Sequence, residues 1–180
     1  MKHKTFSFLL ALLIGMVVSV VSAHDFGVDG IYYNITSSTN KTVAVTYQGS
    51  SSRAYTGSVT IPETVTYNGI TYSITSIGGQ AFEGCRGLTS IEIPNSVASI
   101  GSTAFYNCTG LEKATFASIK SLCKISFVDF YSNPLYYAKH LYIGDEEVTE
   151  VVIPDDVTTI GEYNQEIKGE TNVEVIPVIA

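Results

Sequence analysis

The chain has 180 residues and a formal net charge of −7, from 17 acidic and 10 basic side chains. This charge argues against nucleic acid or an anionic membrane surface as partner, because phosphate groups are bound by clustered Lys and Arg. The three cysteines are an odd number, which is not a disulfide framework for an exported protein.

Residues 1–23 predict a secretory signal peptide. A basic start is followed by an apolar run over 6–21 and by small residues at 21–23, where a signal peptidase would cleave. The alternative is an uncleaved anchor, but the run is at the short end for a membrane span of about 20 residues. We therefore expect a secreted or cell-surface protein, with His24 as its first residue and no membrane insertion after cleavage.

Residues 24–58 predict an N-terminal β cap. Side chains alternate between two faces over 31–36, strand formers fill 42–47, and a polar turn separates them. This pattern is typical of a β-hairpin or a pair of strands. At the end of a repeat array, such a unit would cover the open edge and core of the first coil.

A strand followed by proline, Val59 to Pro62, opens the first coil, and a small hairpin lengthens it. Asn68-Gly69 is a strong signal for a two-residue turn, because both residues tolerate positive φ. The side chains predicted to share the inward face of this hairpin are Val65, Tyr67, Ile70, Tyr72 and Ile74.

The most regular part of the chain is 77–116, which repeats itself at a constant shift. This shift aligns Phe82 with Phe105 and Cys85 with Cys108, and it aligns the residues around them as well. A fixed period of roughly 20 to 50 residues predicts a solenoid of stacked coils, because one coil cannot bury its apolar side alone.

Within one coil, Leu88, Ile91 and Ile93 are predicted to point inward from a short strand. The strand ends at Pro94, which has no N–H to give to a neighbouring strand. Beyond it, the core is expected to continue along the turn through Ile100.

On the far side of the coil, Gly101 is expected to permit a tight bend. Residues 103–106 are expected to form a helical turn whose buried face is Ala104 and Phe105. The chain would then return to the next strand.

Two of the cysteines, Cys85 and Cys108, hold the same place in successive coils and should be neighbours. They form either a buried ladder of free thiols or a disulfide bridge, and the sequence leaves both open. Their spacing fits no zinc pattern, and Cys123 carries no catalytic signature.

The pattern loosens after Phe116. Gly144-Asp145 is expected to join two strands, 141–143 and 147–153, in a second hairpin. The segment 151–154 is then expected to restore the strand of the repeat, so that the predicted solenoid covers 59–161.

Residues 162–180 form a tail with two open interpretations. Ile176-Pro177 lies as far beyond Ile153-Pro154 as Phe105 lies beyond Phe82, but the core positions between them are polar. The tail is either a degenerate coil that closes the stack or the frayed end of a truncated array.

The segment 91–111 reads IEIPNSVASIGSTAFYNCTGL, and partial copies of it begin at Val59 and Val151. These residues resemble the BspA-type leucine-rich repeat family of exported bacterial surface proteins. The residue patterns predict a mainly β fold with short helical turns and the N-terminal β-hairpin as a cap, and the resemblance implies that the repeats form a right-handed leucine-rich-repeat solenoid. It also implies adhesion or protein–protein contact, often with host matrix proteins in members from host-associated bacteria.

The sequence offers no motif for catalysis, a metal or a cofactor. His140 is the one histidine inside the predicted fold, and no motif places a nucleophile or an orienting carboxylate beside it. The acidic clusters 145–147 and 155–156 lack the spacing of a calcium loop, so we interpret them as solvated turns. We therefore expect a protein that is not an enzyme and needs no cofactor.

The predicted function is the binding of a protein ligand by a monomer. Solenoids present one extended surface, so the outward face of the repeat strands is the expected contact surface. Its predicted residues are Ser90, Glu92, Lys113, Thr115, Glu150 and Val152. The alternative is a short structural scaffold, or a truncated repeat fragment, without a ligand of its own.

Overall fold

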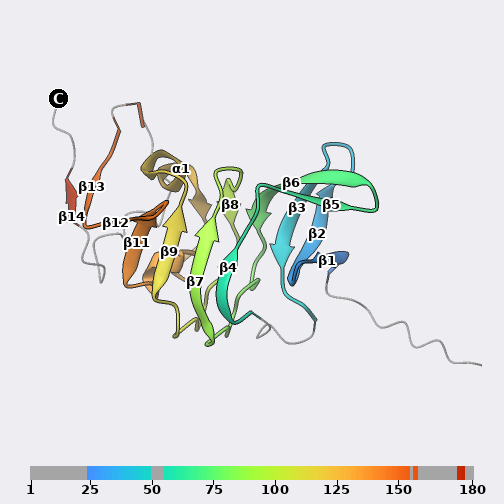
Figure 1. The fold of residues 1–180 in the computed structure, drawn as a ribbon, viewed down its shortest axis with the longest axis horizontal. Helices are drawn as coiled ribbons and strands as arrows, with labels where there is room; N and C mark the ends of the chain where they lie inside the picture. The colour runs from blue at the N-terminus through green and yellow to red at the C-terminus, as the bar shows by residue number, and fades with distance from the viewer. Residues whose placement is uncertain (1–23, 50–54, 155, 158–173, 177–180) are drawn as a thin grey trace, which may run out of the picture.

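The computed structural model describes residues 24–49, 55–154, 156–157 and 174–176 (Figure 1). The predicted signal peptide and nearly all of the predicted C-terminal tail lie outside these residues. The fold is mainly β, and no helix in the described part is long and apolar enough to cross a membrane.

Two sheets share one hydrophobic core. The five-stranded sheet has the order β12-β11-β9-β7-β4, and the larger sheet has the order β1-β2-β3-β6-β8-β10, with β5 paired to β6. The strands of the five-stranded sheet are β4 (Gly57–Thr60), β7 (Leu88–Ile93), β9 (Lys113–Phe116), β11 (His140–Ile143) and β12 (Glu146–Val148). The strands of the larger sheet are β1 (Phe26–Val28), β2 (Ile31–Ser37), β3 (Thr42–Thr46), β5 (Thr64–Tyr67), β6 (Ile70–Ile77), β8 (Ser99–Ile100) and β10 (Ser126–Phe127).

The predicted N-terminal hairpin is confirmed. Strands β2 and β3 pair antiparallel, and β1 adds a third strand on the far side of β2. Strand β3 then pairs parallel with β6, with Val43 opposite Ile74. The hairpin therefore continues one sheet of the repeats (Figure 1).

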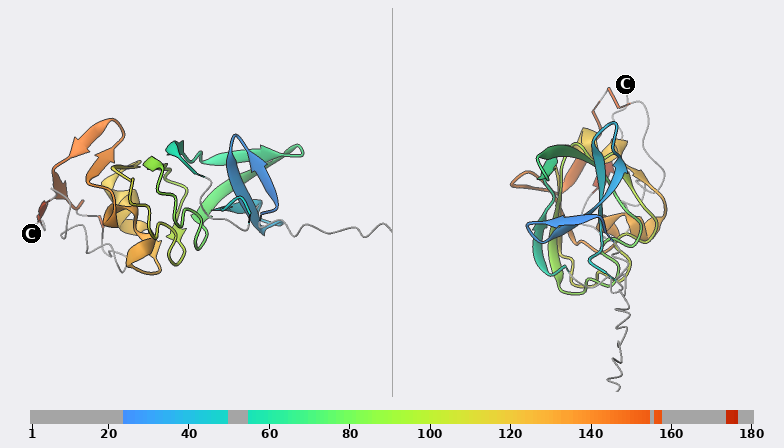
Figure 2. Two further views of the ribbon diagram at one scale, coloured as in Figure 1. Left: turned by 90° about the horizontal axis from the view of Figure 1, so that it is seen from below. Right: turned by 90° about the vertical axis from the view of Figure 1, so that its right-hand side faces the viewer.

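The Asn-Gly turn is also confirmed, since Asn68 and Gly69 have φ of 49° and 76° and join the antiparallel strands β5 and β6. Val65, Tyr72 and Ile74 are buried as predicted, and Tyr67 is half-buried. The prediction for Ile70 is wrong, because 42% of this side chain is exposed. Ile70 adjoins the turn, and the tip of the hairpin extends past the body of the protein (Figures 1 and 2).

The strand of the regular coil behaves as predicted. Leu88, Ile91 and Ile93 are each at most 1% exposed, and β7 ends before Pro94. Strands β7 and β9 pair parallel with Ile91 opposite Ala114, which is the shift found in the sequence.

The far side of the coil differs from the prediction in two respects. Ala104 and Phe105 are fully buried as expected, but 103–106 forms hydrogen-bonded turns and no helix. Thr103 has a φ of 53°, which no right-handed helix accepts. Gly101 is not needed for a bend; its φ is not positive, and an added Cβ would lie 2.4 Å from the backbone nitrogen of Gly79 in the preceding coil.

The parallel strand pairing on this side of the coils, within the larger sheet, was not predicted. Ile77 lies opposite Ile100, and Ile100 lies opposite Phe127, so β6, β8 and β10 follow one another in successive coils. Each coil is therefore held to its neighbour by backbone hydrogen bonds on two sides.

Aromatic rings and thiols stack in the core from one coil to the next. The Phe82 and Phe105 rings are parallel with centroids 5.0 Å apart, and the Tyr55 ring lies 4.6 Å from Phe82. Cys85 and Cys108 are buried and form no disulfide, which confirms the ladder and not the bridge. The Cys108 thiol donates a hydrogen bond to the Phe82 carbonyl at 3.0 Å.

The chain after β9 forms a longer coil. It contains the short helix α1 (Ile119–Lys124) and two 3₁₀ helices, η1 (Phe130–Ser132) and η2 (Pro134–Tyr136). Ser118 caps α1, accepting a hydrogen bond from the Ser121 backbone nitrogen, while the Ser121 hydroxyl accepts one from the Ser118 nitrogen. This reciprocal arrangement is a capping box, made here by two serines.

The second hairpin is confirmed for β11 and β12, which pair antiparallel around Gly144-Asp145. The restored repeat strand is only partly confirmed. Strand β13 (Glu150–Val152) forms, but it pairs with β14 (Glu174–Ile176) in a separate two-stranded sheet. The regular period would place Val152 opposite Val175, whereas it lies opposite Ile176.

Candidate protein-binding surface

The outer face of the five-stranded sheet follows from strand alternation. Ile91 and Ile93 of β7 point into the core, so Ser90 and Glu92 point outward. The same alternation puts Lys113 and Thr115 of β9 on the outer face, beside Ser90 and Glu92 in the pairing register. The structure therefore brings these four predicted residues together.

The register extends this face over the neighbouring strands. One row across the sheet is Ser58, Ser90, Lys113 and His140. The second row is Thr60, Glu92, Thr115, Tyr142 and Glu147. We call these nine residues the outer face.

Side chains along the outer face hold one another in place. The Thr60 hydroxyl donates a hydrogen bond to the Glu92 carboxylate at 3.1 Å. The Lys113 ammonium lies 3.8 Å from the centroid of the Tyr142 ring, which is a cation–π contact.

Glu147 closes the network at the β12 end. Its carboxylate lies 2.6 Å from Nδ1 of His140 and accepts a hydrogen bond from the Tyr142 hydroxyl at 3.3 Å. Reduced hydration, followed by the charge of Glu147, raises the pKa of Tyr142, so this phenol stays protonated and remains a donor. The side chains of His140 and Glu147 are 46% and 35% exposed and are accessible to a partner.

Three predicted residues fit the outer face less well. Thr115 belongs to it but is only 6% exposed, because it lies between Glu92 and Tyr142. Glu150 and Val152 are exposed on β13, which lies outside the five-stranded sheet.

The sequence prediction missed Ser58, Thr60, His140, Tyr142 and Glu147 as members of this face. For His140 and Tyr142 a signal existed, since both alternate with the apolar residue Leu141 in the predicted strand. Glu147 had none, because its position depends on the register of the β11–β12 hairpin.

The described residues contain no group of three or more His, Cys, Asp or Glu side chains placed to hold a metal ion. Cys123 is buried, and burial raises the pKa of its thiol, the opposite of what a nucleophilic cysteine needs. In the acidic cluster 145–147, Glu147 takes part in the outer face. From the cluster 155–156, Asp156 forms an ion pair with Lys120.

Comparison with known families decides what kind of fold this is. The model of the BspA type leucine rich repeat region matches residues 60–163 with six copies. The chain belongs to this family. No curated protein matches the chain.

Several solved structures are similar to this chain. A leucine-rich repeat protein from Bacteroides ovatus ATCC 8483 is 31% identical with a TM-score of 0.46, covering 77% of this chain and 37% of its own. A leucine rich cell surface protein from Faecalibacterium prausnitzii A2-165 is 23% identical with a TM-score of 0.46, covering 84% of this chain and 42% of its own. A leucine-rich repeat protein from Bacteroides capillosus ATCC 29799 is 22% identical with a TM-score of 0.42, covering 65% of this chain and 96% of its own. The chain thus spans less than half the length of the first two.

Proposed function

We propose that this BspA-type repeat protein is secreted or displayed at the cell surface and binds a protein partner through its outer face. The observation that carries the proposal is the group formed by Lys113, His140, Tyr142 and Glu147. These four polar and aromatic side chains converge on neighbouring strands and contact one another.

The chemistry of this group suits a protein ligand. It offers a cation, a carboxylate, an imidazole and a phenol on a sheet surface, a mixture that can pair with both charges and with apolar groups. Aromatic side chains are enriched in protein interfaces. Because the side chains already hold one another, less rotamer entropy is lost when a partner binds.

Three further parts of the proposal rest on the sequence. The predicted signal peptide supports export, and the family resemblance supports adhesion, with host extracellular or cell-surface proteins as candidate ligands. We also infer a right-handed solenoid whose N-terminal β-hairpin acts as a cap, and a monomeric protein.

Binding of the purified chain to immobilised extracellular matrix proteins and to host-cell surfaces tests the proposal. Saturable binding is expected, and Lys113→Ala should weaken it by at least about fivefold, as for a central interface residue. Lys124→Ala is the matched control, because it removes the same charge from α1, away from the outer face. Equal loss in both variants would point to a general charge effect and contradict the assignment.

The alternative, a structural scaffold or truncated fragment without its own ligand, makes the opposite prediction. A well-folded chain would then show no saturable binding to any of these surfaces. Cooperative unfolding, measured by circular dichroism on the same sample, separates that result from a misfolded preparation.

A further inference from the structure

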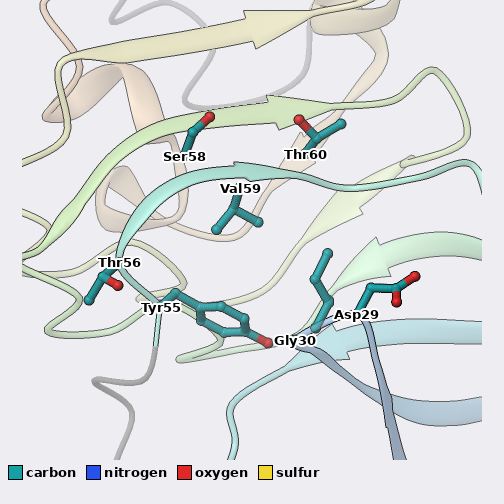
Figure 3. Close-up of a pocket in the computed structure, with 8 residues that line it drawn as sticks. Asp29, Gly30, Tyr55, Thr56, Ser58, Val59 and Thr60 are labelled. Atoms are coloured by element: carbon teal, nitrogen blue, oxygen red, sulfur yellow. The ribbon is translucent and has the colours of Figure 1, made fainter.

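A groove runs between the first coil and the N-terminal hairpin. Its lining residues lie far in the sequence from Lys113, His140, Tyr142 and Glu147. It consists of two adjoining pockets of about 280 and 470 Å³ that share Asp29, Ile31 and Thr60 as lining residues. One wall is β4 with the start of β5, and the other is the turn between β1 and β2. Figure 3 shows the smaller pocket, between β4 and this turn.

The wall made by β4 is an open sheet edge. Strand β4 is the last strand of the five-stranded sheet and pairs only with β7 in the described part of the chain. The backbone nitrogen of Ile61 donates to Glu92 of the neighbouring coil, so alternate residues, Ser58 and Thr60, direct their N–H and C=O groups away from β7. Both residues line the pocket.

Strand β5 repeats this arrangement. Its single partner strand among the described residues is β6, and the Ile74 nitrogen donates to the Glu63 carbonyl. Alternation therefore directs the backbone groups of Thr64 and Thr66 away from β6, and both residues line the second pocket. The groove is thus edged by backbone donors and acceptors at positions 58, 60, 64 and 66.

The side chains leave the edge accessible. In Figure 3, Val59 points toward the pocket, whereas the side chains of Ser58 and Thr60 point away from it. Tyr55 fixes the inner end of the groove to the hairpin, because its hydroxyl donates to the Thr46 carbonyl at 2.6 Å and accepts from the Tyr32 nitrogen at 3.1 Å.

Asp29 is the one charged side chain among the described residues that line the two pockets. It is exposed on the wall opposite β4. An unpaired sheet edge is a template for an added strand, whose main chain supplies affinity and whose alternate side chains supply specificity. We propose that this groove binds an extended peptide segment of a partner protein, which pairs with β4 and places a basic side chain near Asp29.

The probes are fluorescein-labelled heptapeptides of alternating valine and threonine, with lysine, alanine or glutamate at the centre. Fluorescence anisotropy with the purified chain should show saturable binding, tightest for the lysine peptide. Asp29→Asn should reduce the preference for lysine over alanine by about threefold, the size of an exposed ion pair. Asparagine tolerates the positive φ of 50° at this position, so the turn is retained.

Two changes test the backbone pairing. Thr60→Pro removes the outward N–H without touching the bonds to β7 and should weaken binding by about tenfold, whereas Thr60→Val, which loses the hydroxyl contact to Glu92 but keeps the N–H, should not. The unmodified protein is also tested with heptapeptides that are N-methylated at alternate amides. Binding should be lost when the methyl groups lie on the edge of the peptide that faces β4, and it should be kept when they lie on the opposite edge. The second test holds even if Thr60→Pro does not fold.

Three outcomes would overturn the proposal. They are no saturable binding of any heptapeptide at about millimolar concentration, equal effects of methylation on both edges, and self-association through β4 that excludes peptide. The last would assign the edge to a second copy of this chain. Lys113→Ala should leave heptapeptide binding unchanged, so binding in the groove and binding through Lys113, His140, Tyr142 and Glu147 can fail independently.

Discussion

The two regular coils (77–116) and the longer coil after them (117–143) supply strands to the same sheet by different means. From β7 to β9 the regular shift is kept, with Ile91 opposite Ala114. From β9 to β11 the shift is longer. The regular shift would place Tyr137 opposite Ala114, whereas Leu141 lies there. Ile91, Ala114 and Leu141 are all fully buried, so the inward positions of the sheet are kept while the length of the coil is not.

The regular coils have no spare room between them. An added Cβ on Gly101 would lie 2.4 Å from the Gly79 nitrogen, and one on Gly110 would lie 2.1 Å from the Arg86 carbonyl oxygen. Phe82 and Phe105 stack directly. A strict period follows, because every coil must present the same small and large groups to its neighbours.

The longer coil uses individual contacts where the regular coils use repetition. Asp129 accepts hydrogen bonds from the Ser102 hydroxyl and the Thr103 nitrogen, and the Tyr137 hydroxyl accepts one from the Asn107 nitrogen. Its additional residues leave apolar side chains at the surface. They are Val128, Phe130, Tyr131 and Tyr136, each 36% to 56% exposed.

The largest expected difference is between two phenylalanines. Phe105→Ala should lower the free energy of unfolding by about 3–5 kcal/mol, because it leaves a cavity between packed coils. Phe130→Ala, at a side chain that is 44% exposed, should cost about 1 kcal/mol or less. Urea unfolding of both variants gives the two values, and similar losses would mean that the longer coil packs as tightly as the regular ones.

Gly101→Ala tests the close approach of the regular coils directly. We expect a loss of about 1–3 kcal/mol, because the methyl group meets the backbone of Gly79 and cannot be relieved by a side-chain movement. Gly49→Ala is the control, since its added Cβ meets no atom of the described residues within 4 Å and its φ is not positive. A stable Gly101→Ala protein would show that the coils can separate slightly at no cost.

The capping box should matter only locally. Ser118→Ala removes the N-cap of α1 and should cost about 1 kcal/mol. Ser126→Ala, at an exposed position of β10, should cost less than about 0.5 kcal/mol. Hydrogen exchange should show faster exchange at the Ser121 and Leu122 amides in Ser118→Ala, with β7 unchanged; a uniform increase would instead mean global destabilisation.

The last prediction concerns alkaline stability, and no effect is expected at neutral pH, where the thiols stay protonated in both states. Burial, followed by the neighbouring Cys85, raises the pKa of the Cys108 thiol from 9.0 to about 12. The unfolded chain therefore loses this proton first, and the stabilising contribution falls as the pH rises from about 9 toward 12. Cys108→Ser keeps a donor for the Phe82 carbonyl but does not titrate in this range, so its urea midpoint should fall less between pH 8.5 and 10.5.

Cys123→Ser provides the comparison from the longer coil. Burial raises the pKa of Cys123 too, without a second thiol among the causes. Its substitution should change the alkaline slope less than Cys108→Ser. The reverse order would place the stronger burial in the longer coil.

The parts of the fold that were predicted correctly depend on short segments of sequence. The Asn68-Gly69 turn needs only the backbone freedom of two residues, and the inward positions Leu88, Ile91 and Ile93 follow from strand alternation and a proline. The errors concern residues whose environment depends on contacts with distant parts of the chain. Ile70 was predicted to be buried but lies at a hairpin tip, and Gly101 was assigned to a bend although its role is the approach of Gly79.

By itself, the sequence determined that the coils repeat at a fixed period and which side chains each coil buries, because both are written in the order of small, apolar and polar residues. The tertiary structure decided which outward residues meet. Glu147 reaches His140 and Tyr142 through the register of a hairpin. Positions 58, 60, 64 and 66 line one groove from two sheet edges, because β4 and β5 each have a single partner strand in the described chain. The physical reason is that strand register and sheet edges depend on how coils of different length stack. This stacking cannot be predicted from a short segment of sequence.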